Sequence, residues 1–159
     1  MRTLLLSLFT ICALFVPMHQ AEAKKPKPKP VYGGFTAGKT FTFTVGEVVS
    51  SATSGTQVIT PAPPVKGIPK FVAGQQVKFT IGKKGELKGP GFNIKFQPGG
   101  DSIAANIYVN KPKKNASPVT ATVHKDTTTG EPIAVSLSFF SFKLVKRVPQ
   151  VTSVYYVLD

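Results

Sequence analysis

A glycine-rich segment near the N-terminus has the spelling of a phosphate-binding loop. The residues from Gly33 to Thr40 match the pattern G-x-x-x-x-G-K-[ST] at every required position. Such a loop binds phosphate only between a strand and a helix, because backbone amides and the helix N-terminus must converge on the anion. Here a Lys-Pro run precedes the motif and alternating Thr and Phe follow it. We therefore interpret the match as accidental and expect a flexible entry into the first strand.

His124 and Asp126 are the residues best suited to acid–base chemistry. Their spacing of two places both on one face of a strand, and serines are plentiful, so a small hydrolase with a Ser-His-Asp site is one alternative. No G-x-S-x-G pattern presents a serine nucleophile. We therefore expect His124 on the solvated side of its strand and assign no catalytic residue.

Residue types that bind metals are scarce beyond the first 23 residues. The single cysteine, Cys12, lies within those residues, and His124 is the one histidine that follows them. No D-x-D-x-D-G pattern supplies calcium ligands. The sequence therefore predicts no metal site and no cofactor.

Lysine is the most distinctive polar residue of the chain. Lys and Arg number 20 against 7 Asp and Glu, which gives a net charge of +13. The candidate polyanion-binding residues form four clusters: Lys24, Lys25, Lys27 and Lys29; Lys83 and Lys84; Lys111, Lys113 and Lys114; and Lys146 and Arg147. Lysine lacks the planar fork of arginine, so this composition favours nonspecific attraction to polyanions over sequence-specific recognition of nucleic acid. Solubility and the protection of sheet edges are an equally good explanation of the same lysines.

The first 23 residues have the pattern of a signal peptide. Arg2 precedes an apolar run from Leu4 to Val16, and Ala21-Glu22-Ala23 offers the small residues that a signal peptidase reads. The apolar run is too short to cross a bilayer as a helix. We expect cleavage after Ala23, export to the periplasm or the exterior, a basic Pro/Gly-rich arm over residues 24–38, and a single domain over residues 39–159.

Side chains alternate with a period of two from Thr40 onward, which is typical of half-buried strands. The predicted inward sets are Phe41, Phe43 and Val45; Val77, Phe79 and Ile81; Phe92, Ile94 and Phe96; Ile103, Ala105, Ile107 and Val109; and Val119, Ala121 and Val123. Glycine and proline clusters separate these runs, and no helical period is present. The sequence predicts an all-β domain of about 7–9 short antiparallel strands, arranged as a sandwich or a barrel.

Two segments depart from this pattern. Residues 61–69 are too rich in proline for a central strand, so they form either a lid over a binding site or a stiff, inert crossover. In residues 134–145 the apolar side chains change parity between Phe139 and Phe140. A β-bulge at this point would return both apolar sets to one face, and we predict one there.

These features favour a non-enzymatic exported module, with a binding or structural role, that associates electrostatically with anionic polymers of the envelope or matrix. Possible partners are anionic polysaccharides, lipid head groups or other polyanions. The alternatives are the small hydrolase and a barrel that carries an apolar ligand, which the ten phenylalanines after residue 23 favour.

Overall fold

The computed structural model describes residues 27–65, 67–110 and 118–159. The predicted signal peptide lies outside the described residues, as do five of the candidate binding residues: Lys24, Lys25, Lys111, Lys113 and Lys114.

The described residues form eleven strands and no helix, which confirms the prediction of an all-β fold. The strands are β1 (Val31–Tyr32), β2 (Phe35–Thr36), β3 (Thr40–Ser54), β4 (Gln57–Ile59), β5 (Gln76–Ile81), β6 (Leu87–Gly89), β7 (Phe92–Asp101), β8 (Ala105–Asn110), β9 (Val119–Lys125), β10 (Pro132–Val145) and β11 (Val148–Leu158). Three of them, β3, β10 and β11, have 15, 14 and 11 residues and are longer than expected. Helices long and apolar enough to span a membrane are absent from the part of the chain that the structure describes.

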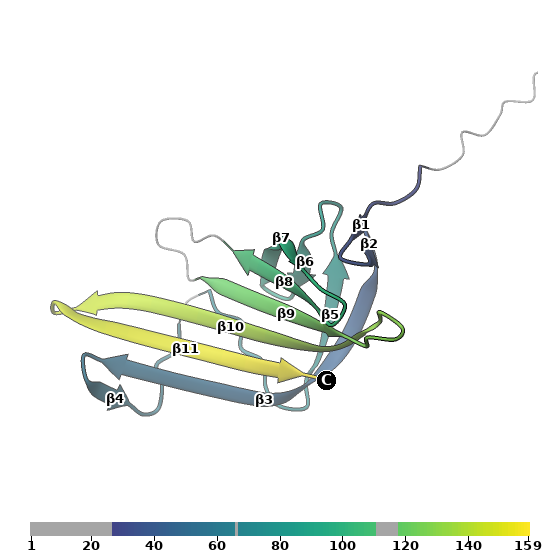
Figure 1. Cartoon of the computed structure of the whole chain (residues 1–159). Coiled ribbons are helices and arrows are strands. Elements are labelled where there is room, and N and C mark those ends of the chain that lie inside the picture. Colours follow the sequence, from purple (N-terminus) through teal and green to yellow (C-terminus); the bar gives the residue numbers. More distant parts are fainter. Residues whose placement is uncertain (1–26, 66, 111–117) are drawn as a thin grey trace, which may run out of the picture.

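Nine strands form one antiparallel sheet in the order β11-β10-β9-β8-β7-β6-β5-β3-β4. Because β11 also pairs with β3, the sheet closes into a ring, and β4 lies outside it against β3 (Figure 1). The first part of β3 pairs with β5 and the rest with β11, while β7 pairs first with β6 and then with β8. These two bent strands therefore make the corners of a barrel.

The interior of the barrel is filled mainly by aromatic and branched side chains. The predicted inward residues Val77, Phe79 and Ile81 of β5 are buried, and so are Val119, Ala121 and Val123 of β9. Phe79 stacks on Phe41 with ring centroids 5.6 Å apart. Alternation in these strands therefore predicted the core correctly.

The prediction for β8 is wrong. Asn106 and Tyr108 face the core and are fully buried, whereas Ile103 and Ile107 are exposed. The Tyr108 side chain is larger than that of isoleucine, so its burial removes more apolar surface from water. Hydrogen bonds inside the barrel compensate for burial of the Asn106 amide. Side-chain volume and a buried polar partner thus outweigh simple hydrophobicity in this strand.

The predicted bulge at Phe139-Phe140 is also absent. Strand β10 pairs with β11 in unbroken register from Val135 to Val145. Register irregularities lie elsewhere. One is at Ile133 near the start of β10, where Pro132 pairs with Lys125 and Ala134 with His124. Another is in β3, where Val157 pairs with Glu47 and Leu158 with Val45, so that Gly46 is the extra residue. Because β10 keeps its register with β11 from Val135 to Val145, Phe140, Phe142 and Leu144 point to the face opposite that of Val135, Leu137 and Phe139.

One end of the long strands extends beyond the barrel (Figure 1). Strand β9 pairs with β10 only as far as Phe139, and β10 continues to Val145, which is about 20 Å further along a strand. We call this part the projecting sheet, and define it as residues 51–54 of β3, 57–59 of β4, 140–145 of β10 and 148–153 of β11.

Residues 31–38, which we expected to belong to the arm, fold against the barrel. Strands β1 and β2 form a small hairpin, and Phe35 is fully buried in the main core. The Tyr32 hydroxyl donates a hydrogen bond to the Lys83 carbonyl at 2.9 Å. A Cβ at Gly85 would collide with the ring of Tyr32, so this contact requires a glycine there. The described part of the arm is therefore Lys27 to Pro30, all exposed.

Candidate functional site

The segment that resembles a phosphate-binding loop has a different structure. It forms the β1–β2 hairpin and then enters β3, a strand, without an intervening helix. Its amides are already used: Ala37 donates to the Pro30 carbonyl, Gly38 to Ile81 and Lys39 to Thr36. The Lys39 ammonium lies 2.6 Å from a carboxylate oxygen of Glu131. The segment therefore presents neither the amides nor the lysine in the arrangement that a phosphate requires.

His124 lies near a serine but not in a triad. Its Nε2 atom is 3.1 Å from the Ser136 hydroxyl on the neighbouring strand β10. The Asp126 carboxylate instead accepts hydrogen bonds from the amides of Thr128 and Thr129 and from the Thr129 hydroxyl. These hydrogen bonds, led by the Thr129 amide, lower the pKa of Asp126. The proposed third member of the triad is therefore turned toward its own loop.

Among the described residues, no group of three or more His, Cys, Asp or Glu side chains lies close enough to hold a metal ion.

The described candidate polyanion-binding residues lie at two ends of the molecule. Lys83 and Lys84 are exposed in the β5–β6 turn, which lies beside the β1–β2 hairpin. The arm residues Lys27 and Lys29 directly precede this hairpin in the sequence. Lys146 and Arg147 form the turn between β10 and β11, at the far end of the projecting sheet (Figure 1). Lys83 and Lys84 are thus brought close to the arm, whereas Lys146 and Arg147 are not.

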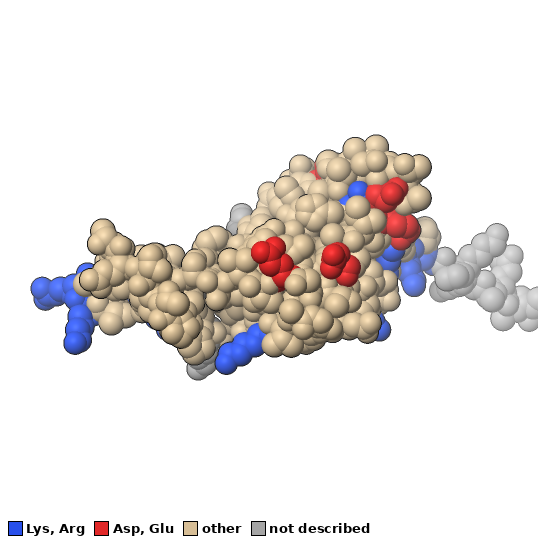
Figure 2. All heavy atoms as spheres, turned by 90° about the horizontal axis from the view of Figure 1, so that it is seen from below, with Lys and Arg blue, Asp and Glu red and all other residues tan. Residues whose placement is uncertain are grey.

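Local interactions occupy several carboxylates of the described residues. Glu131 pairs with Lys39, and Glu86 lies 3.5 Å from the Lys88 ammonium. Backbone hydrogen bonds within its own turn, and then Lys88, lower the pKa of Glu86 although burial opposes this. In the face shown in Figure 2, acidic atoms lie over the barrel, whereas basic atoms lie both around the barrel and at the tip of the projecting sheet. The charge of the molecule is therefore unevenly distributed along its length.

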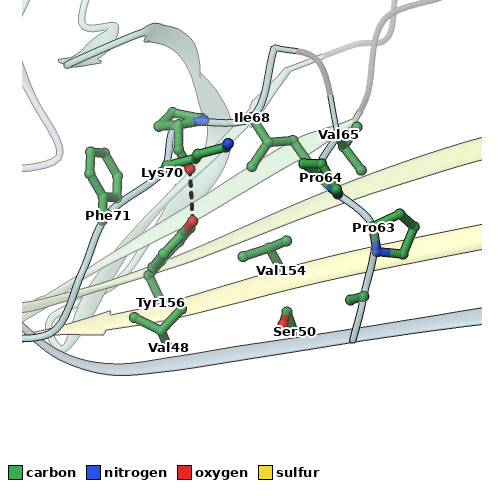
Figure 3. A pocket seen from close by; sticks show the side chains of 12 residues that line it. Val48, Ser50, Pro63, Pro64, Val65, Ile68, Lys70, Phe71, Val154 and Tyr156 are labelled. Atoms are coloured by element: carbon green, nitrogen blue, oxygen red, sulfur yellow. Dashed lines mark hydrogen bonds between the residues drawn. The ribbon is translucent and has the colours of Figure 1, made fainter. Parts of the chain in front are cut away.

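A pocket lies between the proline-rich loop and the inner face of β3 and β11 (Figure 3). Its volume is about 180 Å³. The lining residues are Val48, Ser50, Ala62, Pro63, Pro64, Val65, Ile68, Pro69, Lys70, Phe71, Val154 and Tyr156. The Tyr156 hydroxyl donates to the Pro69 carbonyl at 2.7 Å and holds the loop against the sheet.

This pocket is smaller than the roughly 300–1,000 Å³ of typical small-molecule sites. Its lining is mostly apolar, and its one phenol already bonds the loop. The geometry therefore favours the reading of residues 61–69 as a stiff crossover that covers the core.

A buried cation was missed at the sequence level. Lys125 lies inside the barrel, where its ammonium donates to the Asn106 side-chain oxygen at 3.0 Å and to the Gly33 carbonyl at 3.2 Å. The same ammonium lies 5.9 Å from the centre of the Phe35 ring. A Cβ at Gly33 would collide with Asn106, so the close approach requires glycine. This cluster fastens the β1–β2 hairpin to the barrel wall.

Comparisons with protein-family models, with curated proteins and with solved structures find no match to this chain.

Proposed function

We propose that the chain is an exported, non-enzymatic binding module that associates electrostatically with anionic polymers of the cell envelope or extracellular matrix. The observation that carries this proposal is the exposure of basic side chains at both ends of the fold. Lys27, Lys29, Lys83 and Lys84 are exposed near the arm, and Lys146 and Arg147 are exposed at the opposite tip.

The low acid content makes these charges available to a partner. The ion pairs found among the described residues join Lys39 to Glu131 and Lys88 to Glu86, and neither involves a residue of the two basic ends. Each lysine that neutralises an anionic group releases a counterion, so affinity should fall steeply with salt. Point charges without a fixed fork give little discrimination among polymers of equal charge density.

The test is binding of the full chain to heparin over a range of salt concentrations. We expect the logarithm of affinity to fall linearly with the logarithm of salt, by about 0.9 per contact on a polymer with the charge density of duplex DNA. Deletion of residues 24–29 should make the slope shallower by up to about four contacts. Pro30 is retained because its carbonyl accepts the Ala37 amide.

The double variant Lys83→Gln/Lys84→Gln should reduce the slope further, by about two contacts. Lys95→Gln is the matched control, since Lys95 is an exposed lysine on β7 outside both basic ends. Absence of heparin binding at low salt, or an affinity that does not change with salt, would show that the lysines serve solubility and would overturn the proposal.

A further inference from the structure

The projecting sheet exposes its largest apolar side chains on the face that points away from the core. Residues paired directly across an antiparallel sheet share a face, and Phe142 pairs with Val151 while Leu144 pairs with Pro149. Val58 extends this set through its pairing with Thr53. We call this surface the outer face. It comprises the apolar residues Phe140, Phe142, Leu144, Pro149, Val151 and Val58 and the hydroxyl residues Thr53, Ser51 and Ser153, of which Ser153 pairs with Phe140.

The opposite, inner face is small and polar and buried next to the barrel, and toward the tip it carries Lys143, Gln150 and the exposed pair Val145 and Val148. Ser141, Thr152 and Ala52 are paired across the three strands, and all are buried. The outer face is exposed instead: the exposed fractions are 66% for Phe142, 68% for Leu144 and 75% for Val58. Packing among residues 27–65, 67–110 and 118–159 does not cover these apolar side chains, and contiguous exposed apolar surface of this kind marks interaction sites.

Cations surround the end of this apolar face. Lys146 and Arg147 are exposed in the turn at this end, Lys143 is exposed on the inner face beside them, and residues 51–59 and 140–153 contain no Asp or Glu. The acidic atoms visible in Figure 2 lie away from this tip, over the barrel. The projecting sheet therefore combines an apolar surface with a net charge of one sign.

The turn at the tip keeps its two cations in an unfavourable backbone conformation. Lys146 and Arg147 have φ angles of 50° and 68°, and Val145 pairs with Val148, so the turn is of the two-residue type. Such turns favour Asn-Gly, because at positive φ the Cβ atom of most L-residues lies too close to the backbone carbonyl oxygen. A Lys-Arg pair at this position is a departure that points to a role outside folding.

We propose that the projecting sheet docks on an anionic lipid surface, with its outer face in the interfacial layer and its basic tip on the lipid phosphates. This rests on the proposed electrostatic function and assigns it one target. Phe142 and Leu144 enter the boundary between head groups and acyl chains, where amphipathic elements bury their apolar side chains by about 5–10 Å. Lys146 and Arg147 extend back to the phosphates, as long basic side chains do at membrane interfaces.

A lipid surface matches both properties of the sheet. A soluble polyanion satisfies the three cations but offers no apolar layer for Phe142, Leu144 and Val58. A second copy of the chain offers an apolar face but presents the same three cations and no carboxylate in this sheet. The combination of apolar face and basic tip therefore favours lipid.

The experiment measures sedimentation of the full chain with vesicles of phosphatidylcholine alone and of phosphatidylcholine mixed with phosphatidylglycerol. We expect binding only to the anionic vesicles. Lys146→Asn/Arg147→Gly should weaken it about 30-fold, because each basic residue near an anionic membrane contributes a few-fold to tenfold in affinity. This variant relieves the strained turn, so a folding defect will not mimic the result. Lys83→Gln/Lys84→Gln removes the same charge at the other end and should have a much smaller effect.

Phe142→Thr/Leu144→Thr tests the apolar contribution and should also abolish most of the vesicle binding, with Ile103→Thr in the β7–β8 connection as the matched exposed control. A fluorophore on Phe142→Cys, in a Cys12→Ser background, should shift to shorter wavelength on anionic vesicles, and the same label on Ile103→Cys should not.

If the full chain binds heparin but not anionic vesicles, the docking proposal alone is overturned. If it binds neither heparin nor vesicles, the proposed function is overturned as well. Equal losses from the tip variant and from Lys83→Gln/Lys84→Gln would show a diffuse charge effect and also overturn the docking proposal. A dimer in analytical ultracentrifugation that Phe142→Thr/Leu144→Thr dissociates would assign the outer face to a second copy instead.

Discussion

The Lys125 ammonium donates a hydrogen bond to the Asn106 side-chain oxygen at 3.0 Å, and both side chains are buried inside the barrel. We predict that Lys125→Met lowers the free energy of unfolding by about 1–3 kcal/mol, because it leaves the buried acceptors on Asn106 and Gly33 without this donor. Urea denaturation of the purified variant measures the change.

The double variant Lys125→Met/Asn106→Leu distinguishes a hydrogen-bond network from simple packing. Replacing both partners removes the donor and the acceptor of their mutual hydrogen bond, although the Gly33 carbonyl then loses both of its donors. Because each single variant already loses the Lys125–Asn106 hydrogen bond, the double variant should lose less stability than the sum of the two single variants. Additive losses would show that the two side chains do not interact energetically.

Tyr108 gives the barrel an alkaline limit. Burial raises the pKa of Tyr108 to about 12, and the neighbouring Asn106 side chain opposes this only in part. A raised pKa in the folded state contributes stability that is complete below the unfolded pKa of 10 and is lost as the pH rises toward 12. We therefore predict that the free energy of unfolding falls by up to about 3 kcal/mol between these pH values.

The Tyr108→Phe variant is the control for this prediction. Among the described residues the Tyr108 hydroxyl has no hydrogen-bond partner of good geometry, so its removal should be close to neutral at pH 7. Denaturation curves at several alkaline pH values should then show a flatter profile for the variant. An identical fall in both proteins would assign the alkaline transition to other groups.

The proline-rich loop is held to the sheet by the Tyr156 hydroxyl, which donates to the Pro69 carbonyl. We predict that Tyr156→Phe lowers the free energy of unfolding by about 1 kcal/mol and speeds proteolysis within residues 61–69. Limited proteolysis followed by mass spectrometry locates the cuts. Unchanged cleavage would show that loop packing alone holds this segment.

The turn between β10 and β11 should be improved by residues that tolerate positive φ. We predict that Lys146→Asn/Arg147→Gly raises the free energy of unfolding by about 1–2 kcal/mol. Lys143→Asn removes a charge beside the turn without changing the turn itself, and should not stabilise the protein. Thermal denaturation of the two variants gives the comparison, and equal midpoints would argue against strain.

Alternation predicted the core in β5 and β9, where one parity of the strand is apolar and the other polar, but the same pattern gave the wrong face in β8. It failed in β10 because both parities are apolar there, and a sequence does not state whether the second set is buried or exposed. In β3 the parity of the inward-facing side chains changes at the bulge residue Gly46. This bulge arises from pairing with β11, which lies more than one hundred positions further along the chain. In β8, burial of Asn106 depends on Lys125, which no local pattern of β8 contains.

The candidate site was predictable in its charges but not in their arrangement. Clusters of lysine are visible in the sequence, whereas their separation onto two ends follows from strand lengths and from the closure of the ring. Lys125 did carry a signal: it continues the inward parity of Val119, Ala121 and Val123. A charged residue at an inward position is a reason to search for buried partners.

The pairing of β3 with β11 also governs the order in which the molecule can assemble. The hydroxyls of Ser51 and Ser153 lie 2.8 Å apart although 102 residues separate them along the chain. Bringing such distant segments together has a large loop-closure entropy, and folds dominated by such pairings form slowly. A chain threaded N-terminus first through a narrow channel would have β3 on the far side long before β11 emerged. The ring therefore closes last, and until then β3 offers an unpaired edge to any strand or chaperone that reaches it first.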